Sequence, residues 1–343
     1  MNRSIWAWVR LLGGVGILAV LLWRLGTGAF LDGLRVIDAG TLGTAFAIGV
    51  ATTVLCAWRW CLVARGLGLR LSLRSAVADY YKALFINAAL PGGVLGDVDR
   101  AVQHGREEGD VGRSVRAVVL ERTAGQIVLL SVGTTVLLTV PSPVLTQLRA
   151  HGADVAAAAA TLAVAAVVLV VAVGRLRSGA SRWARAARTA VAEIRSGLLA
   201  RRNWPGIVLA STAVLAGHLA TFVVAARAAG SHASLLRLTP LMLLALLAMA
   251  LPLNVGGWGP REGVTAWAFG AAGLSAAQGL TIAVVYGLFA FVAALPGLAV
   301  ILTRAVARRR AKHAAQPQVT GTGRPATVVA EILPVRELVG SGA

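Results

Sequence analysis

Long runs of almost uncharged residues are the feature that most constrains how this chain can fold. They cover residues 11–22, 154–173, 206–226 and 277–303. An α-helix needs about 20 apolar residues to cross a hydrocarbon core of about 30 Å, and several of these runs are long enough. Only 14% of the residues are charged, whereas a soluble domain has roughly a quarter. The sequence therefore predicts an all-α polytopic membrane protein.

Basic residues outnumber acidic ones by 33 to 14, which gives a formal net charge of +19. So basic a chain often binds nucleic acid. Here the arginines lie mostly in short connectors between apolar runs, as the positive-inside rule requires, so we expect no nucleic-acid partner. The most basic connector, residues 175–202, holds eight arginines and a single acid, Glu193. We predict a multi-pass protein of the inner (plasma) membrane, with this connector and both termini in the cytoplasm.

About six segments are predicted to cross the membrane completely. They are residues 6–23, 41–58, 116–140, 154–173, 206–229 and 277–303. The second ends in Trp58-Arg59-Trp60, which we interpret as an aromatic belt with a snorkelling arginine. The connector 175–202 carries apolar residues at helical spacing, which favours an amphipathic helix on the inner leaflet over a solvated basic loop. Residues 1–305 thus form one multi-pass domain, and residues 306–343, which lack a sustained pattern, are predicted to be a disordered cytoplasmic tail.

Two further apolar stretches, about residues 76–106 and 238–274, are interrupted by glycine and proline. The first breaks at Leu90-Pro91-Gly92-Gly93 and the second at residues 252–260. Backbone that leaves the helix at membrane depth has unpaired N–H and C=O groups, which are tolerated only inside protein or beside water. We therefore predict two re-entrant, broken-helix hairpins. The span count makes them enter from opposite faces, as in an inverted-repeat transporter with its site between the hairpins.

Each break is followed by residues suited to a lipid headgroup. Glycines permit close backbone approach, Pro260 fits the first turn of a new helix, and the N–H groups of that turn favour an anion. Arg100 and Arg261 add charge suited to a phosphate. Asp97 and Glu262 either pair with these arginines or bind a cationic headgroup. The alternative is structural, a tight turn followed by an ion pair that anchors the helix end.

Glu121 and Arg122 open the third span, where interfacial snorkelling and a role in the site fit the sequence equally well. The candidate lipid-binding residues are Asn87, Gly92, Gly93, Asp97, Arg100, Glu121, Arg122, Asn254, Gly256, Gly257, Arg261 and Glu262. No cofactor or metal is expected, because the five histidines lack metal-ligand spacing and the two cysteines support neither a disulfide framework nor a zinc site. His218, on a span, is expected to be a hydrogen-bonded packing residue. Since no Ser/His/Asp arrangement and no Walker lysine can be argued, we expect no enzymatic activity.

Three motifs follow one another along the chain. They are Asn87-x-x-x-Pro91-Gly92-Gly93-x-x-Gly96-Asp97-x-x-Arg100-Ala101, Leu120-Glu121-Arg122 and Pro252-x-Asn254-x-Gly256-Gly257-Trp258-Gly259-x-Arg261-Glu262-Gly263. Through these motifs the chain, over residues 10–305, resembles the lysylphosphatidylglycerol synthase transmembrane region family. This family is the flippase-like domain of the multiple peptide resistance factor proteins. The resemblance implies a multi-pass membrane domain that moves a modified phospholipid, or a related lipid, between leaflets.

In the fused relatives of that family a soluble aminoacyl-transferase domain follows the membrane part. Only a short tail follows residue 305 here, so aminoacylation is not expected. Our leading expectation is a stand-alone translocator of a membrane phospholipid or a polyprenyl-type lipid. The alternative is a non-transporting membrane partner that holds a lipid for a glycosyltransferase or a lipid-modifying enzyme. An intramembrane enzyme is disfavoured, because no base and no nucleophile can be identified.

Overall fold

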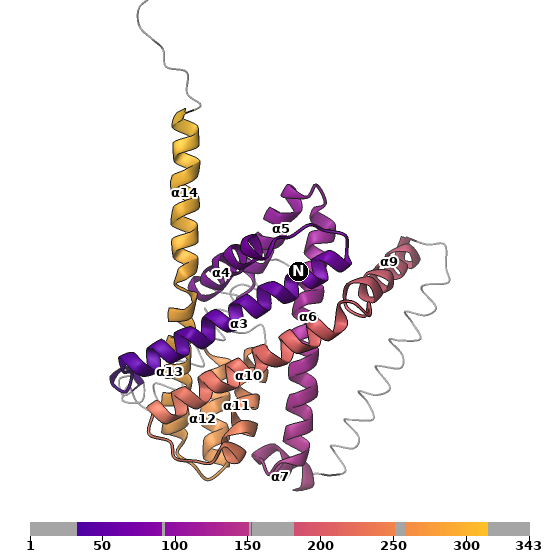
Figure 1. Cartoon of the computed structure of the whole chain (residues 1–343). Helices are drawn as coiled ribbons and strands as arrows, with labels where there is room; N and C mark the ends of the chain where they lie inside the picture. Colours follow the sequence, from indigo (N-terminus) through magenta and orange to yellow (C-terminus); the bar gives the residue numbers. More distant parts are fainter. Residues whose placement is uncertain (1–32, 91–92, 151, 153–181, 251–257, 315–343) are drawn as a thin grey trace, which may run out of the picture. The chain divides into compact units, whose positions relative to one another are not determined.

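The computed structural model describes residues 33–90, 93–150, 152, 182–250 and 258–314, and these residues form an all-α structure (Figure 1). The helices are α3 (Ala39–Gly66), α4 (Leu73–Ala89), α5 (Leu95–Glu107), α6 (Val111–Thr139), α7 (Pro143–Ala150), α9 (Arg182–Gly197), α10 (Trp204–Ala228), α11 (Leu235–Met249), α12 (Pro260–Ala271), α13 (Ala276–Ala294) and α14 (Pro296–Ala314). The chain divides into two units, Met1–Ile301 and Leu302–Ala343. The fold and the site described below belong to the first unit.

Within the described residues, three helices are long and apolar enough to cross a membrane: α3, α10, and the helix Ala276–Ala307 that α13 forms with the start of α14. They correspond to the predicted spans 41–58, 206–229 and 277–303. The predicted span 116–140 corresponds to α6, which has 29 residues and therefore a length of about 40 Å. The spans predicted at residues 6–23 and 154–173 lie outside the described residues. The chain is an all-α polytopic membrane protein, as the sequence predicts.

Polar residues set the starts of several long helices. Asp38 precedes α3 and accepts hydrogen bonds from the backbone N–H groups of Gly40 and Thr41, at 2.7 and 3.0 Å. Donation from the N–H groups of Thr41 and Gly40 lowers the pKa of the Asp38 carboxyl. Ser72, Asp110 and Ser275 cap α4, α6 and α13 in the same way. Such caps satisfy N–H groups that have no partner inside the helix.

The helices α3 and α10 pack along each other in opposite directions (Figure 1). Two glycines of α10 permit this contact. A Cβ at Gly206 would lie 2.8 Å from Cδ1 of Leu62, near the end of α3. A Cβ at Gly217 would overlap the side chain of Thr52, which lies earlier in α3. Small residues at a helix interface are the usual means of close packing in membranes.

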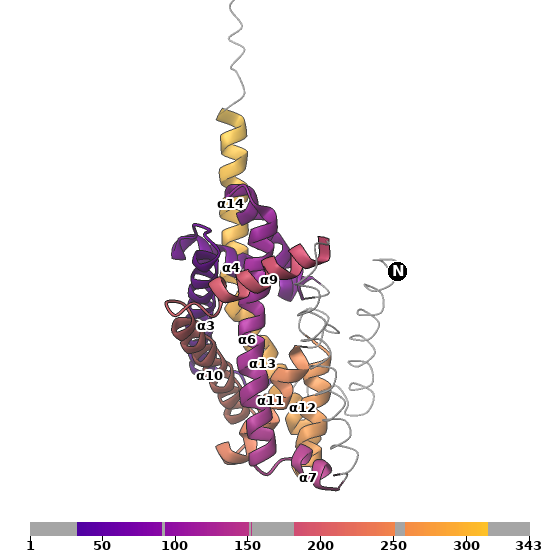
Figure 2. The same ribbon diagram turned by 90° about the vertical axis from the view of Figure 1, so that its right-hand side faces the viewer.

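The order of elements occurs twice in the described chain. A long helix, a pair of shorter helices and a second long helix form α3, α4–α5 and α6, and then α10, α11–α12 and α13. Figures 1 and 2 show the pair α4–α5 and the pair α11–α12 at opposite ends of this unit. Together with the antiparallel packing of α3 and α10, this arrangement agrees with the predicted inverted repeat. Each predicted hairpin is thus a pair of helices, and residues 91–92 and 251–257 of their connections lie outside the described residues.

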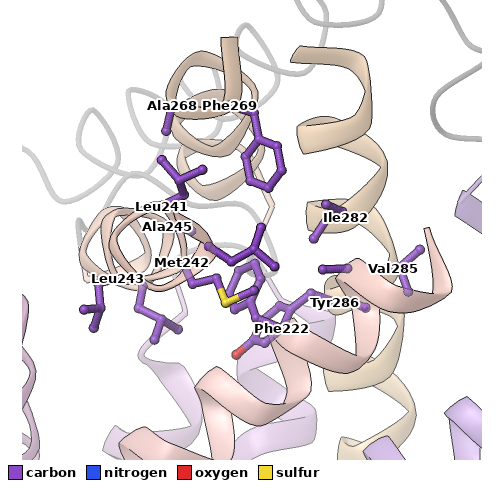
Figure 3. Close-up of a cluster of buried hydrophobic side chains, with 14 of the residues drawn as sticks. Phe222, Leu241, Met242, Leu243, Ala245, Ala268, Phe269, Ile282, Val285 and Tyr286 are labelled. Carbon is purple, nitrogen blue, oxygen red and sulfur yellow. The ribbon is translucent and has the colours of Figure 1, made fainter. Parts of the chain in front are cut away.

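Apolar side chains of α10, α11, α12 and α13 form a buried cluster that holds the second helix pair in place (Figure 3). Phe222 of α10 stacks on Tyr286 of α13, with ring centroids 4.0 Å apart and ring planes inclined by 17°. Met242 of α11 and Phe269 of α12 are buried in the same cluster. Tyr286 consequently has a fixed position, which matters because its hydroxyl reaches the site described below.

The predicted amphipathic helix in the connector 175–202 is present as α9, so the alternative of a basic loop is wrong for Arg182–Gly197. Its acid, Glu193, binds Arg116 of α6 with a distance of 2.6 Å between Arg116 Nε and Glu193 Oε2. Its end packs on the end of α3, since a Cβ at Gly66 would lie 2.5 Å from the carbonyl oxygen of Ser196. Near the C-terminus of the chain, α14 continues to Ala314. Residues 306–314 of the predicted tail are therefore helical, and residues 315–343 lie outside the described part.

Candidate functional site

A fully buried carboxylate, Glu121 of α6, binds arginines from two other helices. Its Oε1 lies 2.6 Å from Nη2 of Arg59 in α3, and its Oε2 lies 2.8 Å from Nη2 of Arg100 in α5. The hydroxyl of Tyr80 donates a third hydrogen bond to Oε1, at 3.3 Å. Because α6 begins at Val111, Glu121 lies about three turns inside the helix. Interfacial snorkelling is therefore the wrong interpretation of Glu121.

A second carboxylate, Asp97 in the first turn of α5, extends this cluster. Its Oδ1 accepts from Nε of Arg100 at 2.9 Å and from Nη2 of Arg122 at 2.7 Å. Its Oδ2 accepts from the amide of Asn87 at 3.2 Å. The structure thus brings together Asn87, Asp97, Arg100, Glu121 and Arg122, five of the residues predicted from the sequence. The backbone N–H of Gly96 donates to Asn87 Oδ1 at 2.8 Å, so it does not face a ligand.

Arg59 also belongs to this cluster, and its interpretation as a snorkelling residue is wrong. The helix α3 runs to Gly66, so Arg59 lies about two turns before its end. Its side chain is buried, and Nη1 donates to the hydroxyl of Ser211 in α10 at 3.0 Å. Gly125 of α6 makes room for it, since a Cβ there would lie 2.9 Å from Arg59 Nη1. The apolar residues 61–64, which continue the run beyond Arg59, are the signal that could have identified it as buried.

Trp60, the other end of the predicted aromatic belt, is fully buried, so the belt interpretation is wrong there too. Its ring contacts His104 of α5 edge-on, with ring centroids 5.6 Å apart. The guanidinium carbon of Arg100 lies 4.6 Å from the centroid of the Trp60 ring and 4.5 Å from that of Tyr80. Arg100 is therefore enclosed between two aromatic rings and two carboxylates.

The cluster, which we call the Glu121 cluster, consists of Arg59, Tyr80, Asn87, Asp97, Arg100, Glu121 and Arg122. Its three guanidinium groups and two carboxylates give 3 − 2 = +1 unit of charge. The arginines differ in access. The side chain of Arg100 is 0% exposed, whereas that of Arg122 is 40% exposed. Arg122, rather than Arg100, therefore has room for an external anion.

The start of α12 holds a second buried ion pair. Pro260 is the first residue of this helix, as predicted, and Gly259 before it has a φ of 116°, which favours glycine. Glu262 Oε2 accepts from the backbone N–H of Gly259 at 2.7 Å, and Glu262 Oε1 accepts from Nε of Arg261 at 2.9 Å. The guanidinium carbon of Arg261 lies 5.3 Å from the ring centroid of Trp258 and 5.2 Å from that of Tyr286.

This geometry bears on the predicted role of Arg261 and Glu262 in lipid binding. The carboxylate of Glu262 occupies the position at the helix N-terminus that the sequence analysis gave to a phosphate. Arg261 is bound to the same carboxylate. These contacts favour the structural alternative, in which the pair anchors the start of α12, and lipid contact by these two residues stays a prediction.

A cavity of about 230 Å³ lies between α3, α6, α10, α11 and α13. It is lined by Cys56, Arg59, Arg122, Gly125, Gln126, Leu129, Ser211, Val214, Leu215, His218, Leu246, Met249, Ala250 and Tyr286. Arg59 and Arg122 belong to the Glu121 cluster, and the ring of Tyr286 faces Arg261, so the cavity borders both ion-pair clusters. His218 Nδ1 is 2.9 Å from the Tyr286 hydroxyl, which confirms the predicted hydrogen bond of this histidine.

Four of the predicted site residues, Gly92, Asn254, Gly256 and Gly257, lie outside the described residues. Gly93 is described, and its φ of 60° is one that favours glycine in the turn after α4. Within the part of the chain that the structure describes, no three His, Cys, Asp or Glu side chains are grouped so that they could hold a metal ion.

The model of one protein family, described as the lysylphosphatidylglycerol synthase TM region, matches residues 7–312. The matched region contains both helix pairs, the Glu121 cluster and every side chain that lines the cavity. No curated protein and no solved structure matches the chain.

Proposed function

We propose that this chain, which belongs to the lysylphosphatidylglycerol synthase TM region family, translocates a phospholipid or a related lipid between the leaflets of the bacterial inner membrane. The observation that carries the proposal is the cavity of about 230 Å³ among the helices, whose lining includes the charged side chains of Arg59 and Arg122. Ionisable side chains at membrane depth are costly, and in membrane proteins they usually line a substrate pathway.

The size and lining of the cavity suit a lipid headgroup. Pockets that enclose a whole drug-sized ligand measure roughly 300–1,000 Å³, whereas this cavity measures about 230 Å³. It therefore has room for a headgroup, with the acyl chains left among the apolar helices. Leucines at positions 129, 215 and 246 line it beside the arginines, so that one cavity offers both polar and apolar contacts.

The two helix pairs supply a route for alternating access. The first pair reaches the cavity through Asp97 of α5, which binds the cavity residue Arg122. The second pair reaches it directly through Leu246 and Met249 of α11. Because the pairs lie at opposite ends of the unit (Figure 2), movement of either pair would change access to the cavity from one side only.

The proposal includes no catalytic activity of the chain itself, and it places both termini in the cytoplasm. The carboxylates nearest the cavity are poor candidates for a general base. Asp97 and Glu121 each accept hydrogen bonds from two arginines, so these oxygens already have partners and are not free to take a proton from a substrate. The cytoplasmic position of α9 is supported by its packing on the end of α3, a segment that is also assigned to the cytoplasm from its arginines.

The test is leaflet exchange in proteoliposomes. Headgroup-labelled phosphatidylglycerol, phosphatidylethanolamine and a polyprenyl phosphate are each incorporated, and the inner-leaflet label that becomes accessible to an external quencher is followed over time. We expect at least one lipid to exchange faster than in protein-free vesicles. If a folded sample leaves all three rates unchanged, translocation is wrong. Lipid that the same sample still retains in native mass spectrometry would then indicate a partner that presents lipid to a glycosyltransferase or lipid-modifying enzyme.

A further inference from the structure

We infer that the lipid cargo is anionic and carries no headgroup amine, because the described lining of the cavity offers cations and hydrogen-bond donors but no carboxylate. This inference names the substrate class of the proposed translocator, and it rests on the proposed function only in taking the ligand to be a lipid. It also separates this chain from a carrier of lysyl-modified lipid, which the name of the family suggests.

Among the described residues, every charged side chain that lines the cavity is a cation. Its charged side chains are Arg59 and Arg122, and its other polar side chains include those of Gln126, Ser211 and His218. No aspartate or glutamate is among the described lining residues. The described lining can therefore bind an anion through several side chains, and it offers no acid to pair with a headgroup ammonium.

The acids that bind the two arginines of the cavity already have their partners. Both oxygens of Glu121 accept from arginines, and its side chain is 0% exposed. Asp97 accepts from Arg100 and Arg122 through the same oxygen, Oδ1, and its Oδ2 accepts from Asn87. A headgroup amine that reached either acid would have to displace an arginine and leave that guanidinium buried without a partner, which is strongly unfavourable.

The net charge of the Glu121 cluster points to an anionic ligand. Three arginines against two acids leave one positive charge, and Arg122 is the arginine with substantial exposure. A phosphodiester would balance this charge, and the planar guanidinium of Arg122 can bind two of its oxygens. A lysyl-modified headgroup would add ammonium groups beside Arg59 and Arg122. Such like charges repel more strongly inside a protein than in water.

The first experiment measures which lipid the full-length protein retains. Purified protein is incubated with equimolar phosphatidylglycerol and lysylphosphatidylglycerol, and the bound lipid is counted by native mass spectrometry. We expect at least tenfold more phosphatidylglycerol, which corresponds to about 1.4 kcal/mol. Equal retention, or a preference for the lysyl-modified lipid, overturns the inference. Displacement of the lipid by an equal concentration of free glycerol phosphate would also overturn it, because the site would then bind a soluble anion.

The second experiment adds a carboxylate to the cavity. Gln126 lies one turn after Arg122 on α6, so Gln126→Glu places an acid beside that arginine. We expect the preference for phosphatidylglycerol to fall by at least tenfold. The control Gln103→Glu adds the same charge to α5 at a position that does not line the cavity, and it should keep the wild-type preference. If Gln126→Glu does not fold, Ser211→Asp adds the acid from α10, beside Arg59. An unchanged preference in a folded acidic variant shows that the cavity does not select the lipid.

The two proposals can fail separately. If phosphatidylglycerol is retained selectively but neither lipid changes leaflet in proteoliposomes, translocation is wrong and the anionic ligand stands. If both lipids change leaflet at the same rate and are retained equally, translocation stands and the inference about charge is wrong.

Discussion

At the scale of single residues, Glu121 determines the charge balance of the site. It is the shared partner of Arg59 and Arg100, which come from different helices. Removal of one member of a buried ion pair is costly because the remaining charge keeps its desolvation penalty and loses its partner. Here one substitution would affect two guanidinium groups at once.

We therefore expect Glu121→Gln to destabilise the protein by about 3–5 kcal/mol, measured as unfolding in detergent micelles. The matched control is Glu193→Gln in α9. It breaks a more exposed ion pair with Arg116, which lies in α6 like Glu121, and it should cost no more than about 1 kcal/mol. The double variant Glu121→Gln with Arg59→Gln should lose less stability than the two single variants added together. Additive losses, or a Glu121→Gln protein as stable as wild type, would show that the buried pairs do not matter for stability.

Arg122 is the residue through which the Glu121 cluster reaches the cavity. Its guanidinium is bound by Asp97 on one side, yet the side chain is 40% exposed. A phosphate in the cavity would therefore meet a charge that is already oriented, so little side-chain entropy would be lost on binding.

We expect Arg122→Gln to weaken the binding of phosphatidylglycerol more than tenfold, about 1.4 kcal/mol, without unfolding the protein. The control Arg113→Gln removes the same charge from α6 at an exposed position whose partner is Asp110. Native mass spectrometry measures retention of the lipid for both variants. Equal lipid retention by the two variants would remove Arg122 from the site.

At the scale of helices, apolar runs predicted the existence of the spans better than their ends. The ends of α10 lie close to the predicted 206–229, whereas α3 continues past the predicted boundary to Gly66. The charge of Arg59 indicates a span boundary only as long as hydropathy treats every charge as a sign of solvent. The sequence placed Asp97, Arg100 and Glu121 in the site and offered Asp97 and Arg100 as a pair. It could not pair Glu121 with Arg59, because these two residues lie 62 positions apart in the chain. Arg59 was missed for the same reason.

The motif glycine Gly96 shows a second limit of prediction from sequence. A glycine beside a helix break suggests that the backbone approaches a ligand closely. At Gly96, however, the backbone of α5 approaches the backbone of α4. A Cβ at Gly96 would overlap the backbone of Ala83 in α4. The pair α4–α5, and with it Asp97, therefore depends on the absence of a side chain at this position.

We expect Gly96→Ala to destabilise the protein by about 1–3 kcal/mol, as overpacking usually does, and to lower lipid retention by displacing Asp97. Gly43→Ala is the control, because a Cβ at this position in α3 would meet no atom within 4 Å. Alanine should be neutral there or stabilise the helix by up to about 1 kcal/mol. Unfolding in detergent measures both variants, and a stable Gly96→Ala protein would mean that α4 and α5 can separate at little cost.

At the scale of the whole multi-pass unit, contacts between helix ends indicate which segments share a side of the membrane. The end of α3 meets the end of α9 and Asn203 at the start of α10, since a Cβ at Gly66 would contact both. The end of α10 meets the start of α13, where the amide of Gln278 donates to the carbonyl of Ala229 at 3.5 Å. These contacts bring the end of α3 together with the predicted cytoplasmic connector 175–202, whereas the predicted external segment 229–237 begins beside the start of α13.

The final prediction is therefore a topology with two independent supports, the distribution of arginines and the contacts between helix ends. Single cysteines at positions 145, 190, 233 and 315 are introduced into a background in which the two buried cysteines, Cys56 and Cys61, are replaced by alanine. In intact cells an impermeant thiol reagent should label positions 145 and 233, and it should reach positions 190 and 315 only after permeabilisation. Position 190 decides most, because it lies in α9, whose end packs on the end of α3. External labelling at position 190 would reverse the sides of α3 and α10, and it would show that the arginine distribution does not set the orientation of this unit in the membrane.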